Sequence, residues 1–449
     1  MQLRFGTSGI RGIVNLSMNN KDLVTFSKSL SLLYKSPFVI SRDTRKGSNL
    51  LLKTIKACLS WLGFEIIDLG LLPTPILAFS TRNLKANMGI QITASHNPSE
   101  YTGIKLFDSD GMALTRDEEK KIEEKMKEVD EEKFDEKFKN GRVYSYEVAT
   151  NDYINALIKI LPETKRRLKI VVDCSNGVGS TATPTILKML GHEVITINSH
   201  TSWIFPGRKP EPTLENLQET SSIVSRIKPD LAIAHDGDAD RVVLLDKNGR
   251  ILPDHFLSSI YLSILLEKRV GDVVLSINTS RAVEDIAREA NCNVHRARLG
   301  KTFVELKRIS GIFATEPSKI IDSSWGFWED GILASTMIVQ YISFNETSLK
   351  DLTRNIPTYY YVQKNIRANK RDYNLLRDEI KNYSFEKKIE GIDELDGIKI
   401  NFDDKSWLLL RFSGTEQKAR VYAEAKKEKD AKRLAEIGLR LIKKSSILL

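Results

Sequence analysis

Three aspartates, Asp236, Asp238 and Asp240, alternate along a short segment between two apolar stretches. Alternate residues of an extended chain point the same way, so a slightly curled loop can direct all three carboxylates at one hard cation. Oxygen ligands of this kind suit Mg²⁺, which keeps coordination positions open for water or phosphate. An EF-hand is excluded, because Arg241 and Lys247 stand where that loop needs glycine and a bidentate glutamate. Since packed like charges without a cation repel one another, the pattern predicts a metal site rather than a solvated turn.

The second candidate is Ser95, which follows a strand expected at residues 88–93 and precedes His96. A serine needs a nearby base to act as a nucleophile, and His96 and Lys105 are the closest in sequence. A lysine base must be partly neutral, so we expect burial or neighbouring positive charge to lower the pKa of Lys105. A reactive serine with a separate metal loop fits phosphoryl transfer, although the spacing alone leaves a structural turn equally open.

Two loops, one near each end of the chain, combine small hydroxyl residues with glycine and arginine. Such loops can turn backbone N–H groups and hydroxyls towards an anion, and arginine adds positive charge. Each loop alone is weakly specific, but two in one chain suggest a ligand with more than one phosphate. The N-terminal loop, residues 6–12, contains Arg11; the C-terminal loop contains Arg411, Ser413, Gly414, Thr415 and Arg420.

The formal net charge of +9 favours anionic partners. Residues 418–449 alone hold ten basic residues against four acidic ones. In the helix expected there, Leu434, Ile437 and Leu441 share one face, which favours a packed helix with a basic outer side over a nucleic-acid-binding one. We therefore expect a small phosphorylated ligand and no nucleic acid.

The elements that must position these residues alternate between strand and helix along 449 residues, the pattern of α/β layers. Three cysteines cannot form a disulfide framework, and no stretch approaches the roughly 18 apolar residues of a membrane helix. We therefore expect a soluble, cytoplasmic protein without membrane association. Strands are expected at 38–41, 65–68, 88–93, 168–172, 193–197, 231–234, 242–245, 272–277, 398–402, 407–412 and 420–425, helices at 49–62, 181–190, 255–266, 282–290 and 426–442, and a loop around 314–320.

The order of these motifs resembles the α-D-phosphohexomutase family, in particular its archaeal or bacterial phosphoglucomutase/phosphomannomutase branch. The resemblance covers essentially the whole chain through GTSGIRG, SRDTR, LLPTP, TASHNPSEYTGIKLF, FPGRKPEPT, DGDADRVVLLD, ATEPSK, WEDGILAS and RFSGTEQKARVYAEA. It implies four domains around a central cleft: three related α/β domains with mixed sheets and a smaller α+β C-terminal domain. The boundaries expected from the sequence are 1–145, with the phosphoserine loop, 146–250, with the metal loop, 251–362, with the sugar loop, and 363–449, with the distal phosphate loop.

The resemblance also implies an activity, the reversible transfer of a phosphoryl group between the 1- and 6-positions of a glucose and/or mannose phosphate. The transfer passes through a phosphoserine and a hexose 1,6-bisphosphate, and it requires Mg²⁺. By position in the motifs, the resemblance implies that Ser95 carries the transferred group and that Lys105 resembles the proton-transfer residue, with His96, Arg11 and Arg241 nearby. It implies a metal site formed by Ser95, Asp236, Asp238 and Asp240. It also implies that Glu316 and Ser318 bind the sugar, and that the distal phosphate is bound by Arg411, Ser413, Gly414, Thr415 and Arg420.

Three departures from the family pattern leave the sugar open. Lys319 replaces a common glycine, Gln417 a common proline, and Lys301 an aspartate of many relatives. A phosphoglucosamine mutase is therefore an alternative, as are a phosphoserine-dependent phosphotransferase or phosphatase and a non-catalytic sugar-phosphate sensor. The expected partner is a hexose phosphate, and the protein is expected to be a monomer or a homodimer.

Overall fold

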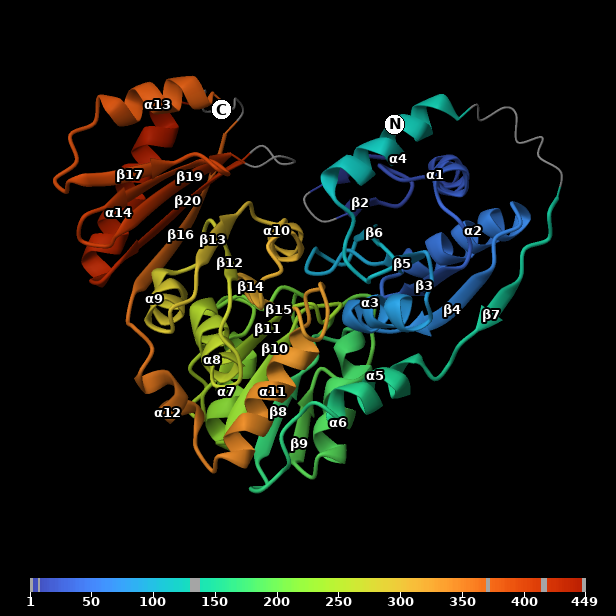
Figure 1. Cartoon of the computed structure of the whole chain (residues 1–449), viewed down its shortest axis with the longest axis horizontal. Coiled ribbons are helices and arrows are strands. Elements are labelled where there is room, and N and C mark those ends of the chain that lie inside the picture. The colour runs from blue at the N-terminus through green and yellow to red at the C-terminus, as the bar shows by residue number, and fades with distance from the viewer. Residues whose placement is uncertain (1–2, 7–8, 130–137, 369–371, 413–417, 446–449) are drawn as a thin grey trace. The chain divides into compact units, whose positions relative to one another are not determined.

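The computed structural model describes residues 3–6, 9–129, 138–368, 372–412 and 418–445. Contacts within the chain divide it into two compact units, whose segments can be followed by colour in Figure 1. Unit 1 is formed by Met1–Ile264 and Ser318–Arg354, and unit 2 by Leu265–Pro317 and Asn355–Leu449. The chain therefore leaves unit 1, returns to it at Ser318 and leaves it again. Unit 1 holds Ser95, the three aspartates and Ser318, and unit 2 holds Glu316, Arg411 and Arg420.

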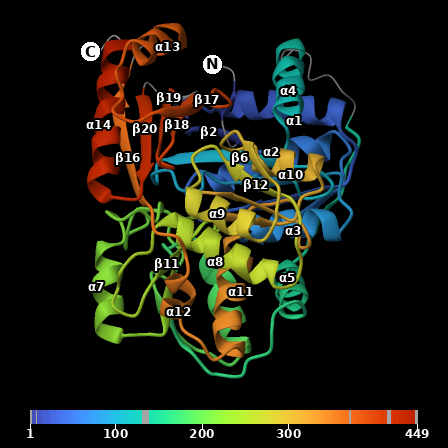
Figure 2. The ribbon, with the colours of Figure 1, turned by 60° about the vertical axis from the view of Figure 1, so that its left-hand side comes forward.

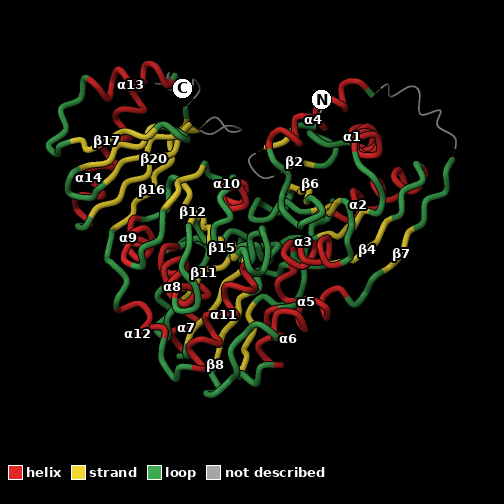
Figure 3. Tube along the Cα trace, viewed as in Figure 1, coloured by secondary structure: helices red, strands yellow, loops and turns green. Residues whose placement is uncertain are grey.

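The first sheet of unit 1 is mixed, with the strand order β1-β2-β6-β5-β3-β4-β7; strands are yellow in Figure 3. β3 pairs in parallel with β4 and β5, whereas β6 runs antiparallel to both β5 and β2. The loop that carries Ser95 joins β5 to β6, so the sheet fixes both of its ends. The strands are β1 (Phe5–Gly6), β2 (Gly9–Ile13), β3 (Phe38–Arg42), β4 (Ile66–Leu71), β5 (Met88–Ile92), β6 (Tyr101–Phe107) and β7 (Val143–Ser145).

Helices cover both faces of this sheet, with α1 (Asn20–Leu33), α2 (Ser48–Trp61) and α4 (Arg116–Glu128) on one face and α3 (Thr74–Asn83) on the other (Figures 1 and 2). Phe26 of α1, Ile55 of α2 and Ile122 of α4 pack into one apolar core with the strands. Like α1, α4 begins with a capping box: Thr115 Oγ1 accepts from the Glu118 N–H, and the Glu118 carboxylate accepts from the Thr115 N–H.

The second sheet of unit 1 has the order β11-β10-β8-β9. β10 is parallel to β8 and antiparallel to β11, so the chain reverses direction in the short segment that holds the three aspartates. The strands are β8 (Lys169–Asp173), β9 (Glu193–Ile197), β10 (Leu231–His235) and β11 (Val242–Leu245), and β15 (Lys319–Asp322) also belongs to this unit. The helices are α5 (Ala149–Ile158), the 3₁₀ turn Val178–Thr181, α6 (Thr183–Met189), α7 (Gln218–Ile227), α8 (Asp254–Leu266, whose end enters unit 2), α11 (Gly331–Phe344) and α12 (Leu349–Arg354).

In unit 2, β12 (Val273–Ser276) pairs in parallel with β13 (Val294–Ala297) and β14 (Phe313–Glu316), flanked by α9 (Arg281–Glu289) and α10 (Thr302–Arg308). The C-terminal sheet is antiparallel, in the order β16-β20-β19-β18-β17. Leu434 and Leu441 are buried and Ile437 packs beside them, as predicted for the last helix. The elements are β16 (Tyr360–Arg367), β17 (Ile389–Asp393), β18 (Ile398–Phe402), β19 (Trp407–Phe412), β20 (Lys418–Ala425), α13 (Tyr373–Lys381) and α14 (Glu428–Ser445).

The predicted fold class, mixed α/β sheets followed by a smaller α+β domain, is confirmed. One local expectation is wrong. The loop expected around 314–320 consists mainly of β14 and β15, because only Pro317 and Ser318 interrupt them, and Ser318 takes a positive φ of 63°. Of the N-terminal anion loop, residues 9–12 belong to β2, which places Arg11 opposite Gly103 of β6, whereas Thr7 and Ser8 lie outside the described residues. No helix within the described residues combines the length and the apolar character needed to cross a bilayer.

Candidate active site

The three aspartates lie between β10 and β11, and their carboxylates are buried. One oxygen from each carboxylate lies within 4.8 Å of the others. Lys105 Nζ donates to Asp238 Oδ2 at 2.8 Å and to Asp240 Oδ2 at 2.7 Å, and Thr74 Oγ1 donates to Asp238 Oδ2 at 2.6 Å. No hydrogen-bond donor of the described residues reaches Asp238 Oδ1 or Asp240 Oδ1, although both are buried. Buried oxygens without a donor fit a cation, so the set can hold a metal ion.

Ser95 lies directly against this loop. Its Oγ donates to Asp236 Oδ2 at 2.7 Å and lies 3.4 Å from His96 Nδ1, and the side chain is buried. A Cβ on Gly237 would stand 2.6 Å from the Ser95 carbonyl oxygen, so only glycine permits this approach. Ser95 has a φ of 50°, in the left-handed region that costs a non-glycine residue energy and that occurs mainly where other contacts hold it.

Arg45 supplies those contacts. Its fully buried guanidinium donates to the carbonyls of Ser95 at 2.7 Å and Asn97 at 2.6 Å, and also to those of Pro98 and Tyr101. Nε donates to Asp43 Oδ2 at 3.0 Å, which completes the donor set. Arg45 lies in the motif SRDTR, but the sequence alone assigns it no function, because the carbonyls it contacts lie 50 to 56 residues further along the chain.

Lys105 corrects an expectation. Burial lowers the pKa of its ammonium, but the adjacent carboxylates of Asp238 and Asp240 raise it by more, so the net shift is upward. The expected lowering is therefore wrong, because the partners outweigh desolvation. In this arrangement Lys105 is a cation that holds two carboxylates.

The three carboxylates differ in their pKa. Burial, with the charges of Asp240 and Asp238, raises the pKa of Asp236 well above its usual range. Burial also acts on Asp240, but the nearby Lys105 and Lys319 lower its pKa by more, and Lys105 does the same for Asp238. Asp236, the partner of Ser95, is thus the member of the cluster that holds a proton most readily.

The other residues predicted near the transferred group also come together in unit 1. Arg11 Nη1 donates to Asn97 Oδ1 in the serine loop, and Arg241 follows the metal loop with Glu211 3.7 Å from its Nη1. Burial, followed by the charges of Arg241 and Arg11, lowers the pKa of His96 well below its usual range. His96 is therefore neutral at physiological pH, with a ring nitrogen available to share a proton with Ser95.

The predicted sugar loop falls in two parts. In unit 1, Ser318 Oγ donates to Asp254 Oδ1 at 2.8 Å, and the Ser318 carbonyl accepts from the Val242 N–H. In unit 2, Glu316 Oε1 accepts from the Gly300 N–H at 2.7 Å and from Thr302 Oγ1 at 3.0 Å. Both side chains are buried, so each is held by its own surroundings.

For the distal phosphate loop, the structure describes only the flanking residues. Arg411 and Arg420 are opposite each other in the pairing of β19 with β20, and Arg411 Nε lies 2.9 Å from Asp396 Oδ2. Ser413, Gly414 and Thr415 lie outside the described residues.

Sequence reading also missed Lys319 as a neighbour of the metal loop. Its Nζ lies 3.3 Å from Asp240 Oδ2 and pairs with Glu329, and the side chain is buried. The lysine in place of a common family glycine marked this position as unusual. It could not identify the partner, because Asp240 lies 79 positions away in the sequence.

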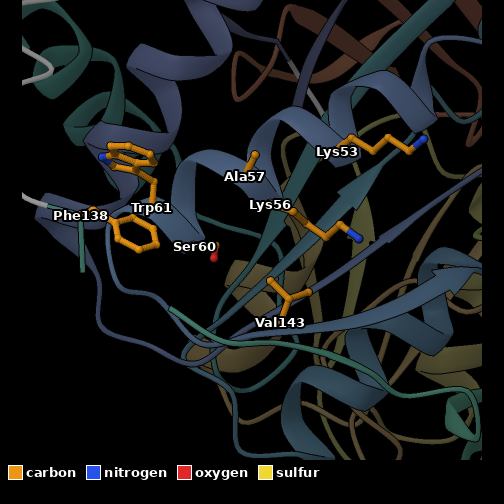
Figure 4. A pocket seen from close by; sticks show the side chains of 7 residues that line it. All are labelled: Lys53, Lys56, Ala57, Ser60, Trp61, Phe138 and Val143. Atoms are coloured by element: carbon orange, nitrogen blue, oxygen red, sulfur yellow. The ribbon is translucent and has the colours of Figure 1, made fainter. Parts of the chain in front are cut away.

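A separate pocket of about 340 Å³ lies on the outer side of α2, where Trp61 and Phe138 pack against each other (Figure 4). Its lining combines these rings with Val143 and two lysines, Lys53 and Lys56. None of its lining residues belongs to the serine–aspartate cluster.

Comparison with known families gives four consecutive matches. The models of the phosphoglucomutase/phosphomannomutase family match here in chain order: alpha/beta/alpha domain I at residues 2–133, domain II at 151–249, domain III at 253–360, and the C-terminal domain at 367–438.

Curated relatives with different names are about equally similar to the chain. A phosphoglucosamine mutase from Methanococcus aeolicus is 35% identical, and a phosphoglucomutase/phosphomannomutase from Thermococcus kodakarensis is 34% identical, each over 98% of both chains. A phosphopentomutase from Thermococcus kodakarensis is 33% identical over 97% of this chain and 96% of its own. Overall identity therefore does not choose among these substrates.

Solved structures share the fold. A phosphoglucomutase/phosphomannomutase family protein from Burkholderia thailandensis superposes with a TM-score of 0.85 at 20% identity over 100% of both chains. An N-acetylphosphoglucosamine mutase from Aspergillus fumigatus, crystallised with GlcNAc-6P and magnesium, reaches a TM-score of 0.62 at 15% identity over 100% of this chain and 96% of its own.

Proposed function

The chain belongs to the phosphoglucomutase/phosphomannomutase family, whose members are phosphohexomutases, and we propose that it transfers a phosphoryl group reversibly between the 1- and 6-positions of a hexose phosphate. Glucose and mannose phosphates are the proposed substrates, and glucosamine phosphate is the main alternative. The observation that carries the proposal is the 2.7 Å hydrogen bond from Ser95 Oγ to Asp236, because it places a buried hydroxyl on the edge of a metal-competent cluster.

Ser95 is the proposed carrier of the phosphoryl group. In the first half-reaction, the bond from phosphorus to Ser95 Oγ breaks as a bond to a free sugar hydroxyl oxygen forms, and the sugar's hydroxyl proton passes to Ser95 Oγ, which gives a hexose 1,6-bisphosphate and a free serine. After the bisphosphate turns end for end, Ser95 Oγ forms a bond to the other phosphorus as the bond from that phosphorus to the sugar oxygen breaks, and the serine proton passes to that sugar oxygen. No phosphate is gained or lost in the complete cycle.

Two side chains contact the Ser95 hydroxyl. Asp236 accepts its hydrogen and so orients the oxygen, and as a proposed ligand of Mg²⁺ it acts as an ionised carboxylate. Neutral His96, 3.4 Å from Ser95 Oγ, is the proposed proton-transfer residue. Lys105 holds its proton more tightly than an isolated lysine, so its proposed contribution is positive charge beside the transferred group.

The proposed metal is Mg²⁺, held by Asp236, Asp238 and Asp240 together with the phosphate on Ser95. When bound, it supplies positive charge that offsets the negative charge on the moving phosphoryl group. The two buried oxygens without donors support this site, as does the magnesium in the Aspergillus fumigatus mutase structure. Arg11 and Arg241 add positive charge from the protein itself.

The remaining predicted residues are proposed to recognise the rest of the substrate. Glu316 and Ser318 are proposed to bind sugar hydroxyls. The distal phosphate is proposed to meet Arg411, Ser413, Gly414, Thr415 and Arg420. Four domains, with boundaries near 145, 250 and 362, and a cytoplasmic location are also part of the proposal.

The test is a coupled assay that converts glucose 1-phosphate, mannose 1-phosphate or glucosamine 1-phosphate to the 6-phosphate, with Mg²⁺ and a trace of the matching 1,6-bisphosphate. We expect turnover by the wild type and at least a thousandfold loss in Ser95→Ala. Wild-type turnover in Ser95→Ala would contradict the proposal.

Intact-mass analysis of the native protein separates the alternatives. A mutase or a phosphotransferase should carry a phosphorylated fraction on the Ser95 peptide, and a non-catalytic sensor should not. A phosphatase would release inorganic phosphate in the coupled assay, whereas the mutase would release none.

A further inference from the structure

Lys319 adds a second lysine to the aspartate cluster. Its ammonium is 3.3 Å from Asp240 Oδ2, the same oxygen that accepts from Lys105 at 2.7 Å. Two ammonium groups therefore share one carboxylate oxygen, while the other oxygen of Asp240 has no hydrogen-bond donor among the described residues. Asp240 is thus joined to both lysines through one oxygen, while the other oxygen, 4.0 Å from Arg241 Nε and without a hydrogen bond from any described residue, can still bind a cation.

Glu329 gives Lys319 its own counter-charge. The two side chains form an ion pair, and the Glu329 carboxylate is largely shielded from solvent, with 18% of its side-chain surface exposed. The cluster therefore consists of three aspartates, two lysines and one further glutamate. Because the lysine and the glutamate carry opposite charges at about the same place, removing either one changes the charge beside the cluster in a known direction.

We propose that Lys319 lowers the affinity of the aspartate cluster for divalent cations, and that Glu329 limits this effect. The inference rests on the metal site of the proposed function. The physical basis is Coulomb repulsion: an ammonium that contacts a carboxylate would repel a dication held by the same carboxylate, and burial weakens the screening between the two charges. The consequence is a readily exchanging ion rather than a permanently held one.

Lys319 could in principle have the opposite effect and strengthen metal binding. The direction in which Mg²⁺ affinity changes when Lys319 is removed therefore decides between the two roles. If Lys319 served mainly to hold Asp240 in a ligating position, its loss would free the carboxylate and weaken metal binding. The repulsion argument predicts stronger binding instead. Lys105 still anchors Asp240 Oδ2 when Lys319 is removed, so the geometry favours repulsion as the larger effect.

The experiment measures Mg²⁺ and Mn²⁺ dissociation constants by titration calorimetry on the phosphatase-treated full chain without sugar. We expect Lys319→Met to bind Mg²⁺ about tenfold or more tightly than wild type, and Glu329→Gln to bind it several-fold more weakly. The double variant should return towards wild type, Lys319→Arg should stay near it, and Lys56→Met, which removes a lysine outside the cluster, should leave the constant unchanged.

Unchanged or weaker Mg²⁺ binding in Lys319→Met would overturn the inference. If that variant fails to fold, as judged by circular dichroism, Glu329→Gln decides the matter, because tighter binding there is also contradictory. Failure of the proposed function is distinguishable: if neither wild type nor Lys319→Met binds Mg²⁺ or Mn²⁺ at millimolar concentration, both proposals fall. If wild type binds but the variants do not differ, only the role of Lys319 falls.

Discussion

Two buried lysines, one in each unit, have opposite pKa shifts. Lys105 in unit 1 contacts the carboxylates of Asp238 and Asp240, and its pKa rises despite burial. Lys399 in unit 2 donates to the carbonyl of Ile277 at 2.8 Å and lies over the ring of Trp407, and burial with the charge of Arg296 lowers its pKa well below the usual value. The difference teaches that direct carboxylate partners, rather than depth, decide the charge of a buried amine.

The largest expected effect is on catalysis in unit 1. Lys105→Met removes the cation that two buried carboxylates share, and we expect kcat/KM to fall by about 10³-fold or more at saturating Mg²⁺. The coupled assay measures this, with circular dichroism as the control for folding. A loss of less than tenfold would show that the charge of Lys105 matters little to the reaction.

A third buried cation, Arg45, extends the comparison to the stability of the fold. Arg45→Met leaves several buried carbonyls of the serine loop without a donor, and we expect the free energy of unfolding to fall by about 3–5 kcal/mol. Urea denaturation measures the change. Arg45→Lys, which can replace only part of the donor set, should recover a minor part of the loss; full recovery would mean that charge alone suffices.

The Lys399 region should respond differently. The native state holds this amine with a lowered pKa, so at pH values below 10.5 the unfolded chain binds more protons and stability rises with pH. Lys399→Met removes this dependence. We expect the variant to be more stable than wild type at pH 7.5, and the gap to narrow by about 1.4 kcal/mol per pH unit while the native amine stays neutral. A gap that does not change up to pH 10 would mean that Lys399 is charged in the native protein.

The smallest expected effect comes from a partly exposed lysine. Lys56 pairs with Asp68, and both side chains are accessible to solvent, at 23% and 16%. Because water screens such a pair, Lys56→Met should change the free energy of unfolding by about 0.5 kcal/mol or less in urea denaturation. A change above about 2 kcal/mol would place this pair with the buried cations instead.

Local sequence pattern predicted the features whose cause is local. Strands β10 and β11 follow from the two apolar stretches around three alternating aspartates. The buried helix face around Leu434 is likewise periodic. In each case the residues that decide the structure are neighbours along the chain.

The residues that were missed depend on distant partners. Arg45 contacts a loop 50 residues away, and Lys319 meets Asp240 across 79 positions. The pKa of Lys105 was misjudged for the same reason, because its carboxylate partners lie 133 and 135 residues further on. Composition and spacing contain no information on such pairs until the sheets bring them together.

The hydrogen bonds from Arg45 to the serine loop also limit which partner, the protein or the ligand, can move between the two phosphoryl transfers. A serine whose flanking carbonyls are tied to one buried guanidinium has no second position from which to reach the far end of a sugar. Under the proposed function, the bisphosphate must therefore turn while Ser95 stays in place. A turnover is completed only when the bisphosphate turns before it dissociates from the protein. The amount of free bisphosphate that accumulates per turnover would measure directly how often it dissociates first.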